Sequence, residues 1–322
     1  MTEKGSDRTL FSGPFLFFCG VCMGFADLIP GISGGTVAFI MGFYSLLMES
    51  LKSFNLKSFK LLFKRDFAAF THQVHWRFLL TLGSGMAVSI LLFSHLIHYI
   101  LGQPILRTYF YALFFGLVLA SFWICFKKIR FNTIGPILVM LLAGFLAFLL
   151  TSASTPAQAS FIPSFPVFFL FDGWVICCGA IAVSALLLPG ISGSYLMSLL
   201  GLYPALIASV AQLGYGIKNM AFPFEAFALL ANFFIGVCLG ALLFAKFLSW
   251  LLTAYPNMTL AALSGFMIGS IRSVWPFWEY SKPVLLSDSS MVNCCSALIM
   301  FAGIAIVLSV DFWSKRRAAA MP

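Results

Sequence analysis

The chain has 322 residues, of which 61% are hydrophobic and only 9% are charged, and its formal net charge is +9. About a quarter of the residues in a soluble globular domain are charged, so this composition excludes that class and indicates a polytopic membrane protein. The apolar runs are long and continuous, close to the roughly 20 residues that a helix needs to cross a bilayer. They favour an all-α fold over a membrane barrel, whose strands alternate apolar and polar residues.

The first apolar unit, residues 13–48, follows a tail at 1–12 that is mixed in charge and has no cleavage site of the signal-peptide kind. The pair Pro30-Gly31 interrupts this unit. Because proline cannot continue a helix from the preceding turn, we predict a re-entrant helical hairpin that enters and leaves the membrane on one side. Two closely packed full spans would fit the same pattern.

Residues 49–77 are polar and basic, with Lys and Arg interleaved with Leu and Phe at near-helical spacing. This pattern predicts an amphipathic helix on the anionic lipids of the cytoplasmic leaflet, and it indicates no nucleic-acid partner. Three apolar spans follow within 78–151, at about 78–101, 109–126 and 134–151. The positive-inside rule then places the uncharged linker at 152–172 outside the cell.

A second interrupted unit at 173–210, broken at Pro189-Gly190, begins the other half of the chain. Three more spans are predicted within 225–310, at about 225–250, 258–272 and 291–310, and a basic tail at 311–322 follows. If 173–210 is a hairpin like the first unit, this tail returns to the cytoplasm. Both termini are then cytoplasmic, as the positive-inside rule requires of a basic tail.

The two interrupted units are copies of each other. Leu28–Tyr44 and Leu187–Tyr203 share 8 of 17 residues, namely Leu, Pro, Gly, Ile, Ser, Gly, Gly and Tyr. A weaker echo relates Phe114–Phe122 to Leu263–Ile271. Each half is a hairpin plus three spans, and because three is odd the second copy is inserted upside down. The chain is therefore predicted to be an inverted-topology repeat, the arrangement typical of secondary transporters.

Each unit contains the elements of an anion site. Proline is well placed where a helix begins, and the glycines allow a tight reversal, so we expect Pro30, Gly31, Pro189 and Gly190 to form the hinges. The second leg would then begin with unpaired N–H groups at the positive end of its dipole, which binds phosphate. The predicted phosphate-binding residues are Ser33, Gly34, Gly35, Thr36, Ser192, Gly193 and Ser194. The structural alternative is a kink whose freed carbonyls are bonded by Ser and Thr.

Two charged residues inside apolar segments complete the predicted site, since charges there are costly and usually functional. Arg272 would bind phosphate, because its planar fork suits phosphate oxygens. Asp27 would repel the phosphate if ionised, so we expect it to be protonated, or paired with a coupling proton or sodium ion, in part of the cycle. The alternatives are a helix cap for Asp27 and snorkelling to the surface for Arg272.

No enzyme, cofactor or metal site is expected. The eight cysteines lie mostly within apolar runs, and the pairs His72/His75 and His95/His98 have no nearby carboxylate to complete a ligand set. An intramembrane lipid-modifying enzyme would need a nucleophile with a base, paired carboxylates or a metal. A small-anion exporter or channel is the closer alternative, because the predicted site would also accept a soluble anion.

Three stretches carry a family resemblance: "GFADLIPGISGGTVAFIMGFY", "LLPGISGSYLMSLLGLY" and "SGFMIGSIRSVWPFW". They resemble the polyprenyl-phosphate transporter family of bacteria and archaea, long catalogued as a domain of unknown function. The resemblance implies a multi-pass protein of the bacterial cytoplasmic membrane that returns undecaprenyl phosphate from the outer to the inner leaflet for cell-envelope synthesis. The family motifs fall on Asp27, Pro30, Gly31, Ser33, Gly34, Gly35, Thr36, Pro189, Gly190, Ser192, Gly193, Ser194, Gly269, Ser270 and Arg272.

Overall fold

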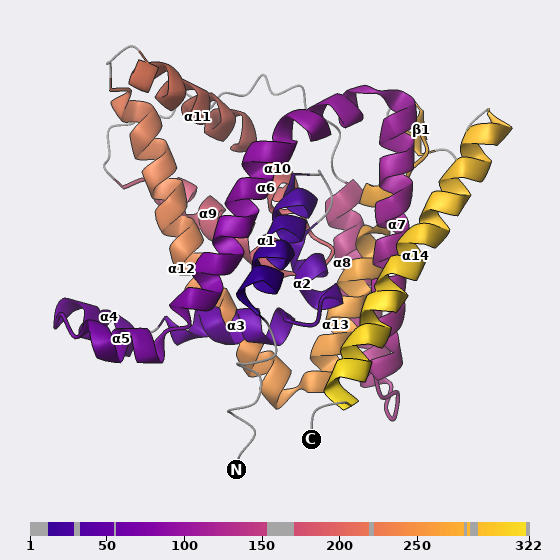
Figure 1. Ribbon diagram of the computed structural model, residues 1–322, viewed down its shortest axis with the longest axis horizontal. Helices are drawn as coiled ribbons and strands as arrows, with labels where there is room; N and C mark the ends of the chain where they lie inside the picture. The colour runs from indigo at the N-terminus through magenta and orange to yellow at the C-terminus, as the bar shows by residue number, and fades with distance from the viewer. Residues whose placement is uncertain are drawn as a thin grey trace.

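The computed structural model describes residues 12–28, 33–54, 56–152, 171–218, 222–279, 282–283 and 289–319, and these form a bundle of helices (Figure 1). The first half contains α1 (Gly13–Asp27), α2 (Gly34–Ile40), α3 (Tyr44–Ser53), α4 (Leu56–Phe63), α5 (Phe67–Gln73), α6 (Trp76–Gly102), α7 (Pro104–Lys128) and α8 (Gly135–Ser152). The second half contains α9 (Gly173–Leu187), α10 (Gly193–Leu199), α11 (Tyr203–Lys218), α12 (Phe224–Ala254), α13 (Pro256–Gly269), the 3-10 helix η2 (Ser270–Val274) and α14 (Ser290–Ala319). A short antiparallel pair, β1 (Trp278–Glu279) and β2 (Lys282–Pro283), precedes α14.

The prediction of an all-α polytopic membrane protein is confirmed. Among the described residues, 5 helices are long and apolar enough to cross a membrane, in α6, α7, α8, α12 and α14, and up to 7 spans result if each of two bent helix pairs counts as one. The span predicted at 258–272 is different, because α13 has only 14 residues and η2 continues it. At about 1.5 Å per residue, α13 is roughly 21 Å long and too short to cross the hydrocarbon core alone.

The two halves repeat their packing. Helix α1 packs along α6 and α9 packs along α12, while α7 packs on α14 and α8 packs on α13. Glycines allow the close approach: a Cβ at Gly20 would lie on the backbone of α6, and one at Gly179 on the backbone of α12. In Figure 1 the chain ascends along α6 and descends along α12.

Each interrupted unit has three helices rather than the two legs predicted. Helix α2 is bent by 118° from α3, and α10 by 111° from α11. Helices α2 and α10 end in the same way. Each is followed by a glycine with positive φ, Gly42 at 78° and Gly201 at 73°, a conformation that favours glycine. The amide after each glycine donates to a carbonyl five residues back, Phe43 to Ala38 and Leu202 to Met197, which is the Schellman motif of a helix end.

The basic segment 49–77 also differs from the prediction of one amphipathic helix. It contains the end of α3 and then two short helices, α4 and α5, separated by a turn in which Arg65 has φ of 57°. Asp66 caps the second of these, because its Oδ1 accepts from the amide of Ala69 at 3.0 Å. Figure 1 shows α4 and α5 projecting from the bundle beside the start of α6.

The core places the interrupted units at the centre of the bundle. A large buried cluster joins α1, α3 and α6 of the first half to α9 and α12 of the second. Phe43 and Met48, at the start and middle of the α3 region, are fully buried. The described helices of both interrupted units therefore contribute to one buried core.

Candidate functional site

The N-terminus of α2 is capped by the protein's own side chains. Asp27, the last residue of α1, accepts a hydrogen bond at Oδ1 from the amide of Gly34 at 2.6 Å. Ser33 accepts at Oγ from the amide of Gly35 at 3.1 Å, and its carbonyl accepts from Thr36 at 2.9 Å. The amides that we expected to be unpaired are thus bonded in this conformation. The carboxylate of Asp27 occupies the place where a phosphate would meet this helix end.

Asp27 retains bonding capacity. Its second oxygen, Oδ2, is buried and has no hydrogen-bond partner among the residues that the structure describes. A Cβ at Gly34 would lie 2.7 Å from this oxygen, so the glycine is what lets the carboxylate sit against the helix end. Among the described residues, the carboxylate of Asp27 has one hydrogen-bond donor, the neutral amide of Gly34. The neighbouring Pro30 and Gly31 lie outside the described residues.

The first motif bonds the broken end of α9. The hydroxyl of Ser33 lies 2.8 Å from the carbonyl of Leu186 and 3.0 Å from that of Leu188. The hydroxyl of Tyr44 donates to the carbonyl of Leu187 at 2.8 Å. These carbonyls have no partner within the helix, because α9 ends just before Pro189. Ser33 therefore performs the function that the structural alternative assigned to it, across the two halves of the chain.

The two motifs also meet at Gly190, which turns with φ of 94°. Its amide donates to Oγ1 of Thr36 at 3.1 Å. Thr36 is 3% exposed and Pro189 is fully buried, so this contact lies inside the protein. Both predicted hinges of the second unit are thus part of a packed junction.

The N-terminus of α10 differs from that of α2. No side chain caps it at Ser192, whose hydroxyl instead bonds that of Ser194 at 2.9 Å. The residue that corresponds to Asp27 in the repeat is Leu186, so this end carries no carboxylate at the equivalent place. A Cβ at Gly193 would lie 2.7 Å from the carbonyl of Ala182, so α10 starts close against α9. Among the described residues, no side chain caps this end of α10, whereas Asp27 and Ser33 cap that of α2.

The third motif lies against the second. A Cβ at Gly190 would come within 2.7 Å of Oγ of Ser270 and 2.9 Å of the carbonyl of Phe266. Arg272 is two residues further, in η2, where it is half-buried. Its Nη1 donates to the hydroxyl of Ser152 at 3.1 Å, and its guanidinium carbon is 5.8 Å from the ring centroid of Phe148. The arginine therefore bridges η2 and the end of α8. Gly269, the last residue of α13, packs on the backbone of Gly144 and holds α13 against α8.

Sequence reasoning gave no function to Tyr44, although the repeat contains a tyrosine at this place in both copies. A tyrosine in an apolar repeat needs a partner for its hydroxyl, and that was the available signal. Among the described residues, no group of three or more His, Cys, Asp and Glu could hold a metal ion.

Comparison with known proteins adds independent information. Residues 23–308 match the family model described as VCA0040-like, undecaprenyl phosphate translocase-like. The chain is 33% identical over 318 residues to a polyprenyl-phosphate transporter of Vibrio cholerae, with 92% of this chain and 96% of the relative covered. It is 27% identical over 260 residues to a polyprenyl-phosphate transporter of Staphylococcus aureus, with 80% and 84% covered. No solved structure matches.

Proposed function

The chain belongs to the undecaprenyl phosphate translocase-like family, and we propose that it returns undecaprenyl phosphate from the outer to the inner leaflet of the bacterial cytoplasmic membrane. It is a transporter of lipid phosphate and not an enzyme. The observation that carries the proposal is the convergence of three motifs at Gly190. Thr36 of the first motif bonds its amide, and Ser270 of the third lies against its Cα.

The two helix ends suggest an order of events. In the proposed topology the second unit enters from the outer side, so its helix end at Ser192–Ser194 meets the phosphate first. Arg272, near the same junction, supplies the full positive charge that a phosphate monoester needs at low dielectric. The end of α2 accepts the phosphate only when Asp27 releases the amide of Gly34. Binding of a proton or sodium ion to Asp27 would remove its negative charge and permit that release.

Asp27→Asn is expected to uncouple transport from the ion gradient. The amide oxygen of asparagine is neutral and accepts from Gly34 more weakly than a carboxylate does, so this cap can open without binding a proton or cation. Lipid binding should persist, and the transport rate should no longer change when the proton or sodium gradient is collapsed. Asp172→Asn is the matched control, because Asp172 also caps a helix start, accepting from Trp174 at 2.9 Å. Asp27→Asn that remains gradient-driven would assign coupling to another group.

The proposed topology places both termini and the helices α4 and α5 in the cytoplasm, with the basic residues of 56–65 on anionic lipid headgroups. In a variant without native cysteines, Lys60→Cys should react with an impermeant reagent only from the cytoplasmic side. Phe222→Cys should react only from outside, since it precedes α12. Both positions are exposed. Reaction of the two from one side would contradict the inverted repeat.

The proposed transport of undecaprenyl phosphate can be tested in cells. Cells that lack this protein and any functional substitute should accumulate undecaprenyl phosphate in the outer leaflet. They should also become more sensitive to agents that capture this lipid at the cell surface. An unchanged leaflet distribution would favour the small-anion exporter.

A further inference from the structure

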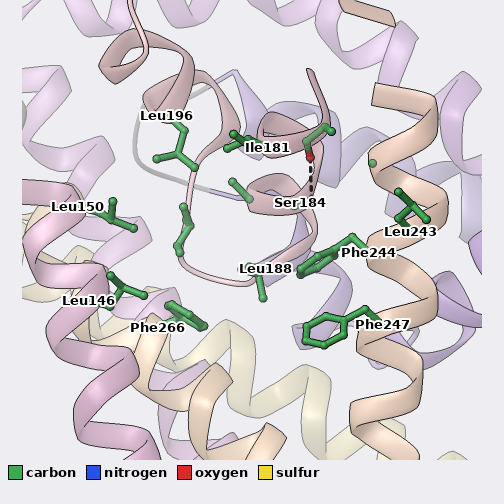
Figure 2. Close-up of a pocket in the computed structure, with 14 residues that line it drawn as sticks. Leu146, Leu150, Ile181, Ser184, Leu188, Leu196, Leu243, Phe244, Phe247 and Phe266 are labelled. Carbon is green, nitrogen blue, oxygen red and sulfur yellow. Dashed lines mark hydrogen bonds between the residues drawn. The ribbon is translucent and has the colours of Figure 1, made fainter. Parts of the chain in front are cut away.

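A groove of about 500 Å³ lies beside the second motif, between α8, α9, α12 and α13 (Figure 2). Its lining is apolar except for Ser184, and the hydroxyl of Ser184 donates to the carbonyl of Ala180 at 2.7 Å. The one polar side chain of the wall is thus bonded within its own helix. Such a lining offers a ligand packing contacts and no charged or polar anchor.

One end of the groove is the Pro-Gly loop itself. Leu188 and Ile191, which flank Pro189-Gly190, belong to the lining. The wall formed by α12 is exposed, with Leu243 66% and Phe247 52% exposed. This helix is long enough to span the membrane, so the groove opens sideways toward lipid. It therefore connects the bilayer with the junction of the three motifs.

We propose that this groove holds the phosphate-proximal isoprene units of the transported lipid, an inference that rests on the proposed function. The volume is within the range of about 300–1,000 Å³ found for ligand pockets, and the remainder of the polyprenyl chain would stay in the bilayer. The wall is no more apolar than lipid tails, so binding gains little from the hydrophobic effect. The groove instead orients one chain so that its phosphate meets the Gly190 junction. A groove for one chain favours a polyprenyl phosphate over a two-chain phosphatidate.

Photo-crosslinking locates the polyprenyl chain of the bound lipid on the wild-type protein. The probe is a polyprenyl phosphate with a diazirine in its second isoprene unit, bound to the wild-type protein in nanodiscs. We expect labelled residues on α9 and α12 at the groove, and competition by unlabelled polyprenyl phosphate but not by dioleoyl phosphatidate. Labels confined to other surfaces, or equal competition by phosphatidate, would overturn the inference. Crosslinking requires binding but not transport, so it locates the binding site of the polyprenyl chain even if the protein does not move the lipid.

Groove filling provides the second measurement. Leu243→Trp should lower polyprenyl-phosphate transport by roughly tenfold or more, because the indole occupies the chain's path and misplaces the phosphate. Leu298→Trp is the matched control, since Leu298 is 69% exposed on α14, away from the groove. Equal rates for the two variants would contradict the groove while leaving the proposed function intact. Wild-type protein that labels in the groove but moves no lipid would instead refute the proposed function.

Discussion

Gly190→Ala is expected to abolish transport, whereas Gly201→Ala should retain most of it. Both glycines have positive φ, 94° and 73°, so an alanine strains either by about 1–2 kcal/mol. Only at Gly190 does the new Cβ meet other groups: Oγ of Ser270 at 2.7 Å, the carbonyl of Phe266 at 2.9 Å and Cα of Met267 at 3.0 Å. Two of these three atoms belong to the backbone and cannot move cheaply, which adds about 1–3 kcal/mol.

The larger consequence at Gly190 is geometric. A shift of this loop separates its amide from Thr36 and moves the second motif off the third. At Gly201 a Cβ would have nothing within 4 Å, so the variant measures backbone strain alone. Transport rates in proteoliposomes are compared at equal amounts of monodisperse protein. Equal loss in the two variants would show that strain, and not the junction, determines the effect.

Arg272→Ala is expected to abolish lipid binding and transport. Removal of one partner from a buried, charge-assisted contact costs about 2–5 kcal/mol, and no helix dipole replaces a full charge. Arg272→Lys should restore part of the binding, because it keeps the charge but loses the planar fork. Arg107→Ala is the control, since Arg107 is exposed at the start of α7. Binding is measured by equilibrium retention of radiolabelled polyprenyl phosphate.

Normal transport by Arg272→Ala would show that the helix ends hold the phosphate alone.

A further variant, Ser152→Ala, removes the hydroxyl to which Nη1 of Arg272 donates. If Ser152 positions the guanidinium, this variant should raise the lipid concentration needed for half-maximal transport and leave the maximal rate unchanged. A variant that loses both its lipid affinity and its maximal transport rate would indicate that Ser152 and Arg272 have a structural function.

The long helices and the place of each motif could be predicted from the sequence, because hydropathy and Pro-Gly pairs are local signals. The spans predicted at 78–101 and 134–151 correspond to α6 and α8. The break between α2 and α3 was missed although Gly42 gives a local signal, a glycine just after a short apolar helix. Because the apolar run continues through Gly42, hydropathy predicted one helix where the structure has α2 and α3.

The contacts inside the site could not be predicted, since they join residues far apart in the chain. Ser33 and Leu186 are separated by 153 residues, and nothing local shows that a serine of one unit bonds the end of α9. Asp27 was predicted to bind a coupling proton or cation in part of the cycle, with a helix cap as the alternative. The structure shows the cap, on the helix end that was expected to bind phosphate. The sequence offered both groups but not their pairing.

The central claim is that this chain moves a polyprenyl phosphate between leaflets, and reconstitution tests it most directly. Purified protein in liposomes with fluorescent polyprenyl phosphate is assayed for loss of the lipid from one leaflet, and in parallel for uptake of inorganic phosphate. The account predicts rapid lipid movement that stops in Gly190→Ala and Arg272→Ala, with no phosphate uptake. Phosphate uptake without lipid movement, or lipid movement equal to that of protein-free liposomes, would contradict it.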